Sequence, residues 1–302
     1  MDIRDALSEV TISPYDELIA YEYLYAQEGS SLKTISKDTV LAHKMPSLVL
    51  REKYGSLVLP DDYEYVADYL KDKTTSFSVI ISNTHSYPDR LMDSTRPTPL
   101  LYYRGDIGLL ESKCISIVGT RKASPEGLRK AALISRDLVD KGFTIVSGLA
   151  KGIDTVALQT AMSSNGHVIG VIGTPIDEYY PKENKHLQDT VAMEHLLVSQ
   201  VPIYRYSIQP FNTKRAYFPE RNELMSAISN ATIVIEASDT SGTLIQARAC
   251  IEQNRPLFIL RSCYESQSIS WPKRIVEHGN GHVYVVDDVE DILDVINHAD
   301  AI

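Results

Sequence analysis

The sequence predicts an α/β protein built on a doubly wound, mostly parallel sheet with helices on both faces. First, apolar runs of strand length alternate with amphipathic segments of helix length from about residue 114 onward. Second, these runs are continuous in Val, Ile and Leu, which is typical of strands buried on both faces. Third, residues 1–98 lack this alternation and show mainly helical patterns. We therefore expect a Rossmann-like domain over residues 99–302, preceded by a small helical domain with a bridging segment over residues 1–98.

The N-terminal part is expected to consist of helices followed by a connection to the sheet. A helix is expected over 14–29, because apolar and tyrosine residues recur there at helical spacing. Its tyrosines are interpreted as packing residues in preference to a stacking platform; they are Tyr15, Tyr21, Tyr23 and Tyr25. The next elements are helices in 31–45 and 60–72, a strand over 76–82 and a Pro-rich connection over 86–106 that ends in another strand.

In the larger domain, strands and helices are expected to alternate. The strands are expected over 114–119, 143–148, 167–173, 195–200, 232–237, 256–260 and 283–286. The helices are expected over 125–141, 154–164, 220–229, 242–253, 272–278 and 288–298. Ligands of doubly wound sheets bind at the carboxyl ends of strands, where helices begin. The turns that follow the strands are therefore the places to search for a site.

Composition and charge narrow the possible functions. The formal net charge is −10, yet residues 101–286 contain 20 bases against 18 acids, so a local basic face and a nucleic-acid partner stay possible. No apolar run suggests a membrane span, and the acidic N-terminus does not resemble a signal peptide. Three cysteines outside any CxxC pair predict reduced, buried thiols and a cytoplasmic protein. The histidines show no metal-ligand spacing, and no metal, cofactor or catalytic residue is assigned.

The turn GTRKAS follows the first strand of the larger domain, and it contains neither G-x-G-x-x-G nor G-x-x-x-x-G-K-[ST]. Gly119 allows close backbone approach, and Thr120 offers a hydroxyl. Arg121 and Lys122 bring positive charge to the start of a helix, which binds anions through its free N–H groups. Taken alone, the motif fits an ordinary turn with solvated bases equally well.

The turn SGLAKGID follows the second strand. Ser147 and Gly148 end that strand, and Gly152 allows a tight turn. Lys151 is interpreted as a ligand contact, because the loop around it is too small to pack a long side chain. Asp154 is expected to cap the following helix.

Two further loops carry small, hydroxylated or cationic residues. Residues 173–187 are expected to form a long polar loop, and such loops are often functional; its candidate contacts are Lys182, Asn184 and Lys185. In EASDTSGTLIQA, Glu236 is interpreted as a capping or hydrogen-bonding carboxylate in preference to a catalytic acid. The candidates for binding an anion at the start of the next helix are Ser241, Gly242 and Thr243.

The segment FPERN places an aromatic residue beside a cation and an amide. Phe218 could stack on a base while Arg221 and Asn222 contact a phosphate. The alternative is that Phe218 is a hydrophobic staple and that Arg221 is solvated in the first turn of a helix.

In this order the motifs resemble the DNA-processing protein A family, also called DprA or Smf. The resemblance covers about Tyr87 to Leu260 and rests on LLYYRGD, IVGTRKASPEG, IVSGLAKGID, YYPKEN, FPERN and IEASDTSGTLIQA. The succession of SGLAKGID, YPKEN and FPERN is far more restrictive than a lone glycine motif. Glu223 is a departure, because members of the family usually have a second arginine at that place.

The resemblance implies a single-stranded DNA-binding protein that is not an enzyme. It implies a homodimer that protects the strand and assists the loading of a RecA-type recombinase during DNA uptake, with no membrane association. Arg121 would bind a phosphate, Lys182 or Lys185 would be the pocket lysine, and FPERN would supply three contacts. The residues whose backbone would form the floor are Gly148, Gly152, Ser241 and Gly242.

Two alternatives remain open at this point. One is a nucleotide-sensing or nucleotide-cleaving protein of the LOG or SLOG type, for example in a defence system or a mobile element. LOG-type cleavage needs a PGGxGTxxE-like element with a catalytic Glu, whereas this chain has SGTLIQA with Gln246. The other alternative is an interaction module, in which the acidic N-terminal helices bind a protein partner.

Overall fold

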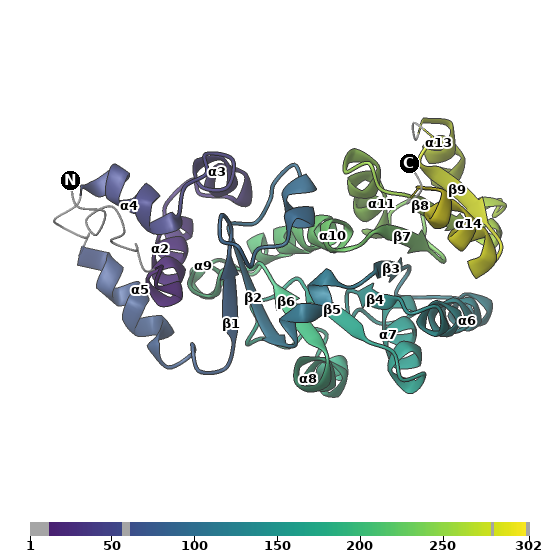
Figure 1. Cartoon of the computed structure of the whole chain (residues 1–302), viewed down its shortest axis with the longest axis horizontal. Helices are drawn as coiled ribbons and strands as arrows, with labels where there is room; N and C mark the ends of the chain where they lie inside the picture. Colours follow the sequence, from purple (N-terminus) through teal and green to yellow (C-terminus); the bar gives the residue numbers. More distant parts are fainter. Residues whose placement is uncertain (1–11, 56–60, 279–280, 300–302) are drawn as a thin grey trace, which may run out of the picture.

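The structure, a computed structural model, describes residues 12–55, 61–278 and 281–299. A nine-stranded sheet runs through the molecule in the order β1-β2-β6-β5-β4-β3-β7-β8-β9 (Figure 1). The strands are β1 Ser78–Ile81, β2 Leu100–Gly105, β3 Cys114–Val118, β4 Thr144–Ser147, β5 Val168–Ile172, β6 Leu196–Ser199, β7 Ala231–Val234, β8 Leu257–Leu260 and β9 Val283–Val286.

Helices precede the sheet and connect its strands. Those that come before β3 are α2 Pro14–Ala26, α3 Leu32–Asp38, α4 Pro46–Tyr54, α5 Asp61–Lys71, and the 3₁₀-helices η1 Asp89–Asp93 and η2 Ile107–Glu111. Those that come after β3 are α6 Pro125–Asp140, α7 Ile153–Ser163, η3 Lys182–Asn184, α8 Lys185–Glu194, α9 Ile203–Ile208, η4 Thr213–Ala216, α10 Tyr217–Ile228, α11 Thr243–Glu252, α12 Arg261–Tyr264, α13 Trp271–His278 and α14 Val289–Ala299. None of the described helices is long and apolar enough to cross a membrane.

The strand order confirms the predicted fold class. Strands β3 to β9 pair in parallel, whereas β1 and β2 pair antiparallel at one edge. From β3 the chain builds outward through β4, β5 and β6, then returns to place β7 on the other side of β3. This reversal defines a doubly wound sheet. The switch point, where such folds bind ligands, lies outside the carboxyl ends of the neighbouring strands β3 and β7.

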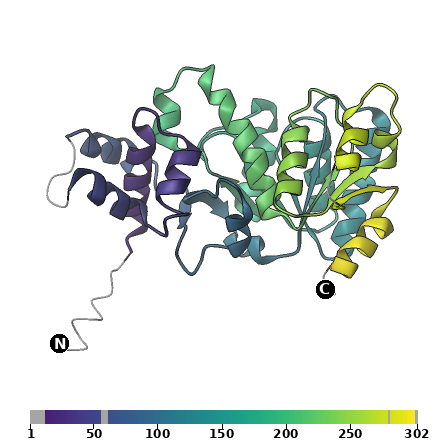
Figure 2. The ribbon, with the colours of Figure 1, turned by 90° about the horizontal axis from the view of Figure 1, so that it is seen from above.

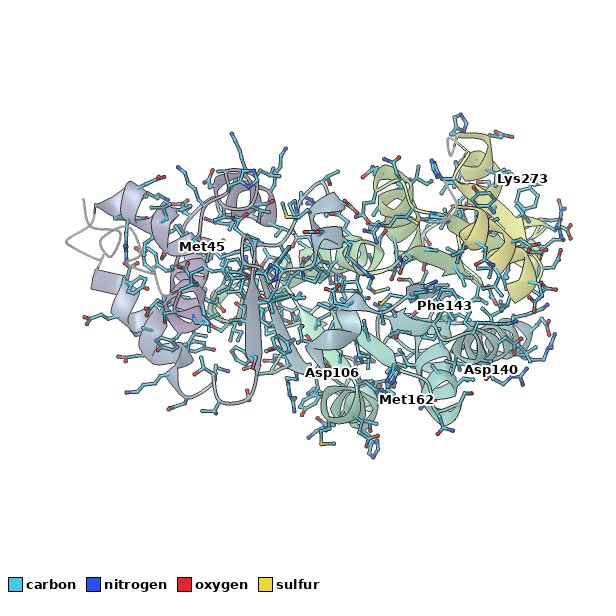
Figure 3. All side chains as sticks on the ribbon, viewed as in Figure 1. Met45, Asp106, Asp140, Phe143, Met162 and Lys273 are labelled. Atoms are coloured by element: carbon cyan, nitrogen blue, oxygen red, sulfur yellow. The ribbon has the colours of Figure 1, made fainter. Side chains whose placement is uncertain are left out.

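Both faces of the sheet are covered by helices, as the continuous apolar strands require. In β3, Ile115 and Ile117 belong to the core shared with α6, α7, α8 and α14, whereas Cys114 and Val118 belong to the core shared with α10, α11 and α13. Phe143, just before β4, lies beside the end of α6 (Figure 3). Strand β3 thus contributes side chains to two separate cores, one on each face of the sheet.

The N-terminal helices lie at the β1 end of the sheet, and α13, β9 and α14 lie at the opposite end (Figures 1 and 2). Tyr21, Tyr23 and Tyr25 of α2 are buried, which confirms the packing interpretation for these three, whereas Tyr15 is exposed. Glu22, on the same helix, is fully buried and accepts hydrogen bonds from the Tyr102 hydroxyl and from two amides at the start of α9. Helix α2 is therefore joined to the sheet by both apolar and polar contacts.

Some elements differ from the prediction. Helix α8 begins inside the segment expected to be a polar loop, and α4, α9 and α12 were not individually predicted. The start of α8 gives little sequence signal, because Asn184 makes no side-chain capping bond and the first turn is polar. Strand β1, expected in the N-terminal part, pairs with β2 in the main sheet.

Candidate functional site

A groove crosses the carboxyl ends of β3, β4 and β5 and reaches the switch point beside β7. It consists of two adjoining cavities of about 350 Å³ and 630 Å³. Arg121, Ala150, Phe218 and Arg221 line both cavities, so these residues form the boundary between them. Turns that are far apart in the sequence thus meet in one place, as the topology predicts.

Close backbone contact between the first two turns depends on a glycine. Gly152 has φ +81°, a conformation that side-chain-bearing residues rarely adopt. A Cβ added there would lie 2.5 Å from the carbonyl oxygen of Thr120 and 3.0 Å from the backbone of Arg121. Gly152 therefore sets the position of the turn that carries Arg121.

Arg221 is built into the floor of the groove. Its side chain is buried, with the residue 6% exposed, and Nη1 donates to the carbonyl oxygens of Gly148 at 2.6 Å and Val171 at 2.8 Å. A Cβ on Gly148 would collide with this guanidinium, so only glycine fits beside it. Burial lowers the pKa of Arg221, and the nearby carboxylate of Asp154 opposes that change. Its Nε has no hydrogen-bond partner among the described residues.

Asp154 has a different role from the expected one. The residue that caps α7 is Gly152, and Asp154 is buried one residue inside the helix. Burial raises the pKa of Asp154, whereas Arg221 and hydrogen bonds from backbone amides in the first two turns lower it. The capping interpretation was wrong because Asp154 is the second residue of α7 and not the residue that precedes the helix.

The cations at the mouth of the groove lie in a contrasting environment. Arg121, Lys122 and Lys182 are exposed, and within the described residues none of them has an ion-pair partner. Lys151 is exposed too, but its Nζ lies 2.8 Å from a carboxylate oxygen of Glu183. Positive charge is therefore concentrated at the mouth of the groove, and among these four cations only Lys151 is paired with a carboxylate in the described residues.

Aromatic rings line the larger cavity. Phe218 packs against Tyr180, with ring centroids 5.1 Å apart, and Phe211 is 74% exposed at the edge. Sequence reasoning did not propose Tyr180 or Phe211 as site residues. Tyr180 lies in the YYPKEN motif, which did offer a signal, whereas Phe211 lies between predicted elements and offered little.

The turn after β7 closes the other side of the groove. The Asn222 side-chain amide donates to the Gly242 carbonyl oxygen at 2.9 Å, and Thr243 is buried with its hydroxyl 3.4 Å from the Gly119 carbonyl oxygen. Glu236 accepts hydrogen bonds from the amide and hydroxyl of Ser124 at the start of α6. The residue that caps α6 is Ser124, and Glu236 is a hydrogen-bonding carboxylate that holds this cap, which agrees with the hydrogen-bonding interpretation.

Thirteen of the seventeen proposed contacts line the groove: Gly119, Thr120, Arg121, Lys122, Gly148, Lys151, Lys182, Phe218, Arg221, Asn222, Ser241, Gly242 and Thr243. The other four lie outside its lining: Ser147, Gly152, Asn184 and Lys185.

The structure gives other contacts to three of those outside the lining. The hydroxyl of Ser147 is buried and donates to the Ile117 carbonyl oxygen at 2.7 Å. The Asn184 amide donates to the Leu149 carbonyl oxygen and the Thr155 hydroxyl, so it ties the third turn to the second. Lys185 lies over the ring of Tyr179 at 4.8 Å. Ser147 and Asn184 therefore support the groove through hydrogen bonds within the protein and do not line it.

Glu223, the departure from the family pattern, lies outside the groove lining. It accepts two hydrogen bonds from the guanidinium of Arg96, a residue of the Pro-rich connection. This acid is therefore neutralised by a partner in the connection. Within the described residues, no cluster of three or more His, Cys, Asp or Glu side chains could hold a metal ion, and the three cysteines are buried free thiols, as predicted.

Fold and groove together define a class: a Rossmann-like protein with a cationic, aromatic-lined groove at the switch point of its sheet. The model of the DNA recombination-mediator protein A family matches residues 78–297. The chain therefore belongs to this family, as the sequence motifs predicted.

Individual relatives agree with this assignment. The chain is 36% identical over 212 residues to the DNA processing protein DprA of Streptococcus pneumoniae, and the match covers 70% of each chain. It is 38% identical over 197 residues to protein Smf of Synechocystis, where the match covers 64% of this chain and 48% of the relative. The chain thus spans about half the length of that relative.

Solved structures show the same fold. The crystal structure of DprA from Streptococcus pneumoniae superposes with a TM-score of 0.71 and 25% identity, covering 94% of this chain and 98% of that one. DprA from Helicobacter pylori superposes with a TM-score of 0.62 and 24% identity over 74% of this chain, and its structure was described for a mode of binding single-stranded DNA. The first match includes most of the N-terminal helical part.

Proposed function

We propose that this protein binds single-stranded DNA in the groove and acts in DNA processing. The observation that carries the proposal is the cationic rim of Arg121, Lys122 and Lys182, which have no ion-pair partner in the part of the chain that the structure describes. This rim lies beside the rings of Phe218 and Tyr180. Exposed cations attract a phosphate backbone, and aromatic faces stack on any base, so the combination suits a single strand without sequence selection. Family membership and the single-stranded DNA binding described for the Helicobacter relative support it.

We propose further that the groove does not cleave nucleotides. The position that would need a catalytic carboxylate is occupied by Gln246, which is buried. Glu236, the other candidate acid, is engaged with Ser124. Both observations favour binding over the nucleotide-cleaving alternative.

The remaining assignments are proposals of the same kind. We propose a homodimer that acts with a RecA-type recombinase during DNA uptake, supported by the description of the family as recombination mediators. The buried free thiols favour the cytoplasm. We also propose that the helical domain ends before β1, near residues 72–77, and not at residue 98, because β1 pairs within the sheet.

Fluorescence anisotropy of a labelled oligo-dT of about 20 nucleotides tests the proposal. Wild-type protein should bind, and affinity should fall steeply with salt because neutralised phosphates release counterions. Arg121→Ala should weaken binding about tenfold and lower the salt slope by about 0.7, the contribution of one phosphate on a single strand. Arg136→Ala, on the exposed face of α6, is the matched control and should bind as the wild type does.

If the wild type binds mononucleotides tightly and ignores the oligonucleotide, the nucleotide-sensing alternative replaces this proposal. If it binds the strand but Arg121→Ala has no effect, the strand lies elsewhere on the molecule.

A further inference from the structure

The stretch between Glu194 and Glu220 contains no acid, in a chain whose net charge is −10. Its second half, YRYSIQPFNTKRAYF, interleaves aromatic residues with Arg205, Lys214 and Arg215. Aromatic residues interleaved with cations are typical of surfaces that follow a single strand. The sequence predictions placed no function on this stretch before Phe218.

Residues 208–215, which we call the rim loop, contribute Phe211 to the lining of the larger cavity. Helix α9 ends at Ile208, and η4 follows after a short turn. The segment lies at the edge of the molecule (Figure 2). Ile208 is 52% exposed and Phe211 is 74% exposed, although Phe211 also lines the groove. Two apolar side chains of this segment thus face solvent, and one of them, Phe211, lies at the cavity.

The rim loop is held in place by contacts with two flanking tyrosines, Tyr206 and Tyr217. The hydroxyl of Tyr217 donates to the Gln209 side chain at 2.8 Å, and the ring of Tyr217 packs against Tyr206. The ammonium of Lys214 lies 4.3 Å from the centre of the Tyr206 ring. Arg215 is exposed, and no hydrogen bond or ion pair involves its side chain within the described part of the chain. The loop therefore presents one apolar ring and two cations on a braced support.

A second exposed aromatic cluster shows why charge decides between candidate surfaces. Tyr65 and Tyr69 of α5 contact Tyr204, with ring centroids 6.3 Å and 5.3 Å apart. Helix α5 also carries three exposed carboxylates, Asp62, Glu64 and Asp68, and the exposed Asp72 follows directly after its end. Those charges repel phosphates, so this cluster does not suit DNA, whereas the rim loop does.

We propose that the rim loop is a second stacking and phosphate-binding position, where the strand leaves the groove. Phe211 stacks on a base outside the cavity, and Lys214 and Arg215 bind the phosphates beside it. The proposal rests on the proposed function and extends it, because a longer strand gains contacts that a groove-filling fragment does not make.

The experiment uses a tryptophan at the rim as a reporter of stacking. The only native tryptophan, Trp271, is buried, so Phe211→Trp adds the one indole that a base can reach there. Saturation with a 20-nucleotide oligo-dT should quench the added fluorescence by about half or more, because stacked bases quench indole emission. Met193→Trp, at a 69% exposed position on α8, is the matched control and should not be quenched.

A charge variant tests the cations separately. The double variant Lys214→Ala/Arg215→Ala should lower the salt slope for the 20-mer by about 1.4, because two phosphate contacts are lost. An unquenched Phe211→Trp in a protein that binds the 20-mer, or an unchanged salt slope, overturns the rim proposal alone. Wild-type protein that binds no 20-mer overturns the proposed function as well. If Phe211→Ala changes the oligomeric state but not DNA binding, the rim loop is a protein contact and the proposal is wrong.

Discussion

The turn after β3 and the start of α10 place two arginines at the same groove in opposite environments. Arg121 is exposed and unpaired within the described residues, whereas Arg221 is buried among carbonyl oxygens beside a buried carboxylate. From the sequence alone, both arginines were predicted to contact phosphates. The difference teaches that one side of this groove is available to a ligand and the other is part of the protein's framework.

The largest expected effect is on stability and concerns Arg221. Arg221→Met should lower the free energy of unfolding by about 3–5 kcal/mol, because it leaves the Asp154 carboxylate and two carbonyl oxygens buried without their partner. Arg121→Met makes the same chemical change at an exposed position and should cost less than about 0.5 kcal/mol. Urea denaturation measures both. Equal, small losses of unfolding free energy in the two variants would show that Arg221 is not part of the framework and is as free as Arg121 to bind a ligand.

A second buried ionisable group, Glu22, predicts how the stability of the protein depends on pH. Burial raises the pKa of Glu22 from 4.5 to about 7, while hydrogen bonds from Tyr102, Ile203 and Tyr204 oppose that change. Between these values the folded protein retains a proton that the unfolded chain releases. The contribution of Glu22 to the unfolding free energy should therefore be fully present below about pH 4.5 and fall by about 3 kcal/mol as pH rises to about 7.

Glu22→Gln should flatten this dependence, because the amide does not titrate, and urea denaturation at several pH values measures it. Residual dependence is expected, since burial also raises the pKa of Glu220 to about 7. Glu52→Gln, at an exposed carboxylate paired with Lys44, should follow the wild-type profile. Parallel profiles for Glu22→Gln and wild type would mean that the pKa of Glu22 is the same in the folded and the unfolded protein.

The sequence was sufficient to predict the sheet but not the assignment of each polar residue. A continuous apolar run indicates a strand that is buried on both faces, so all nine strands were expected, eight of them with bounds close to the observed ones. Asp154 and Asn184 were assigned less well, because their partners are backbone groups of distant turns that no local pattern reveals. Phe211 and α8 were missed for a related reason: exposure and helix starts without caps leave little periodic signal.

The smallest expected effect is on DNA affinity and concerns Lys151, the cation at the mouth of the groove that is paired with a carboxylate. Glu183 pairs with Lys151 at the mouth of the groove, and both side chains are more than half exposed. Such a pair contributes little to stability, so removing the carboxylate should leave unfolding unchanged. It should, however, free Lys151 for a phosphate and remove a repulsive charge from the path of the strand.

Glu183→Gln should therefore bind the 20-nucleotide oligo-dT about two- to threefold more tightly at low salt, and the gain should shrink as salt screens the charges. Anisotropy titrations at two salt concentrations measure it. Glu52→Gln again serves as the control, because it breaks an equivalent exposed Lys–Glu pair in the helical region, away from the groove. Weaker binding by Glu183→Gln would show that the carboxylate positions Lys151 for the strand. Lys151 would then belong, like Arg221, to the framework side of the groove.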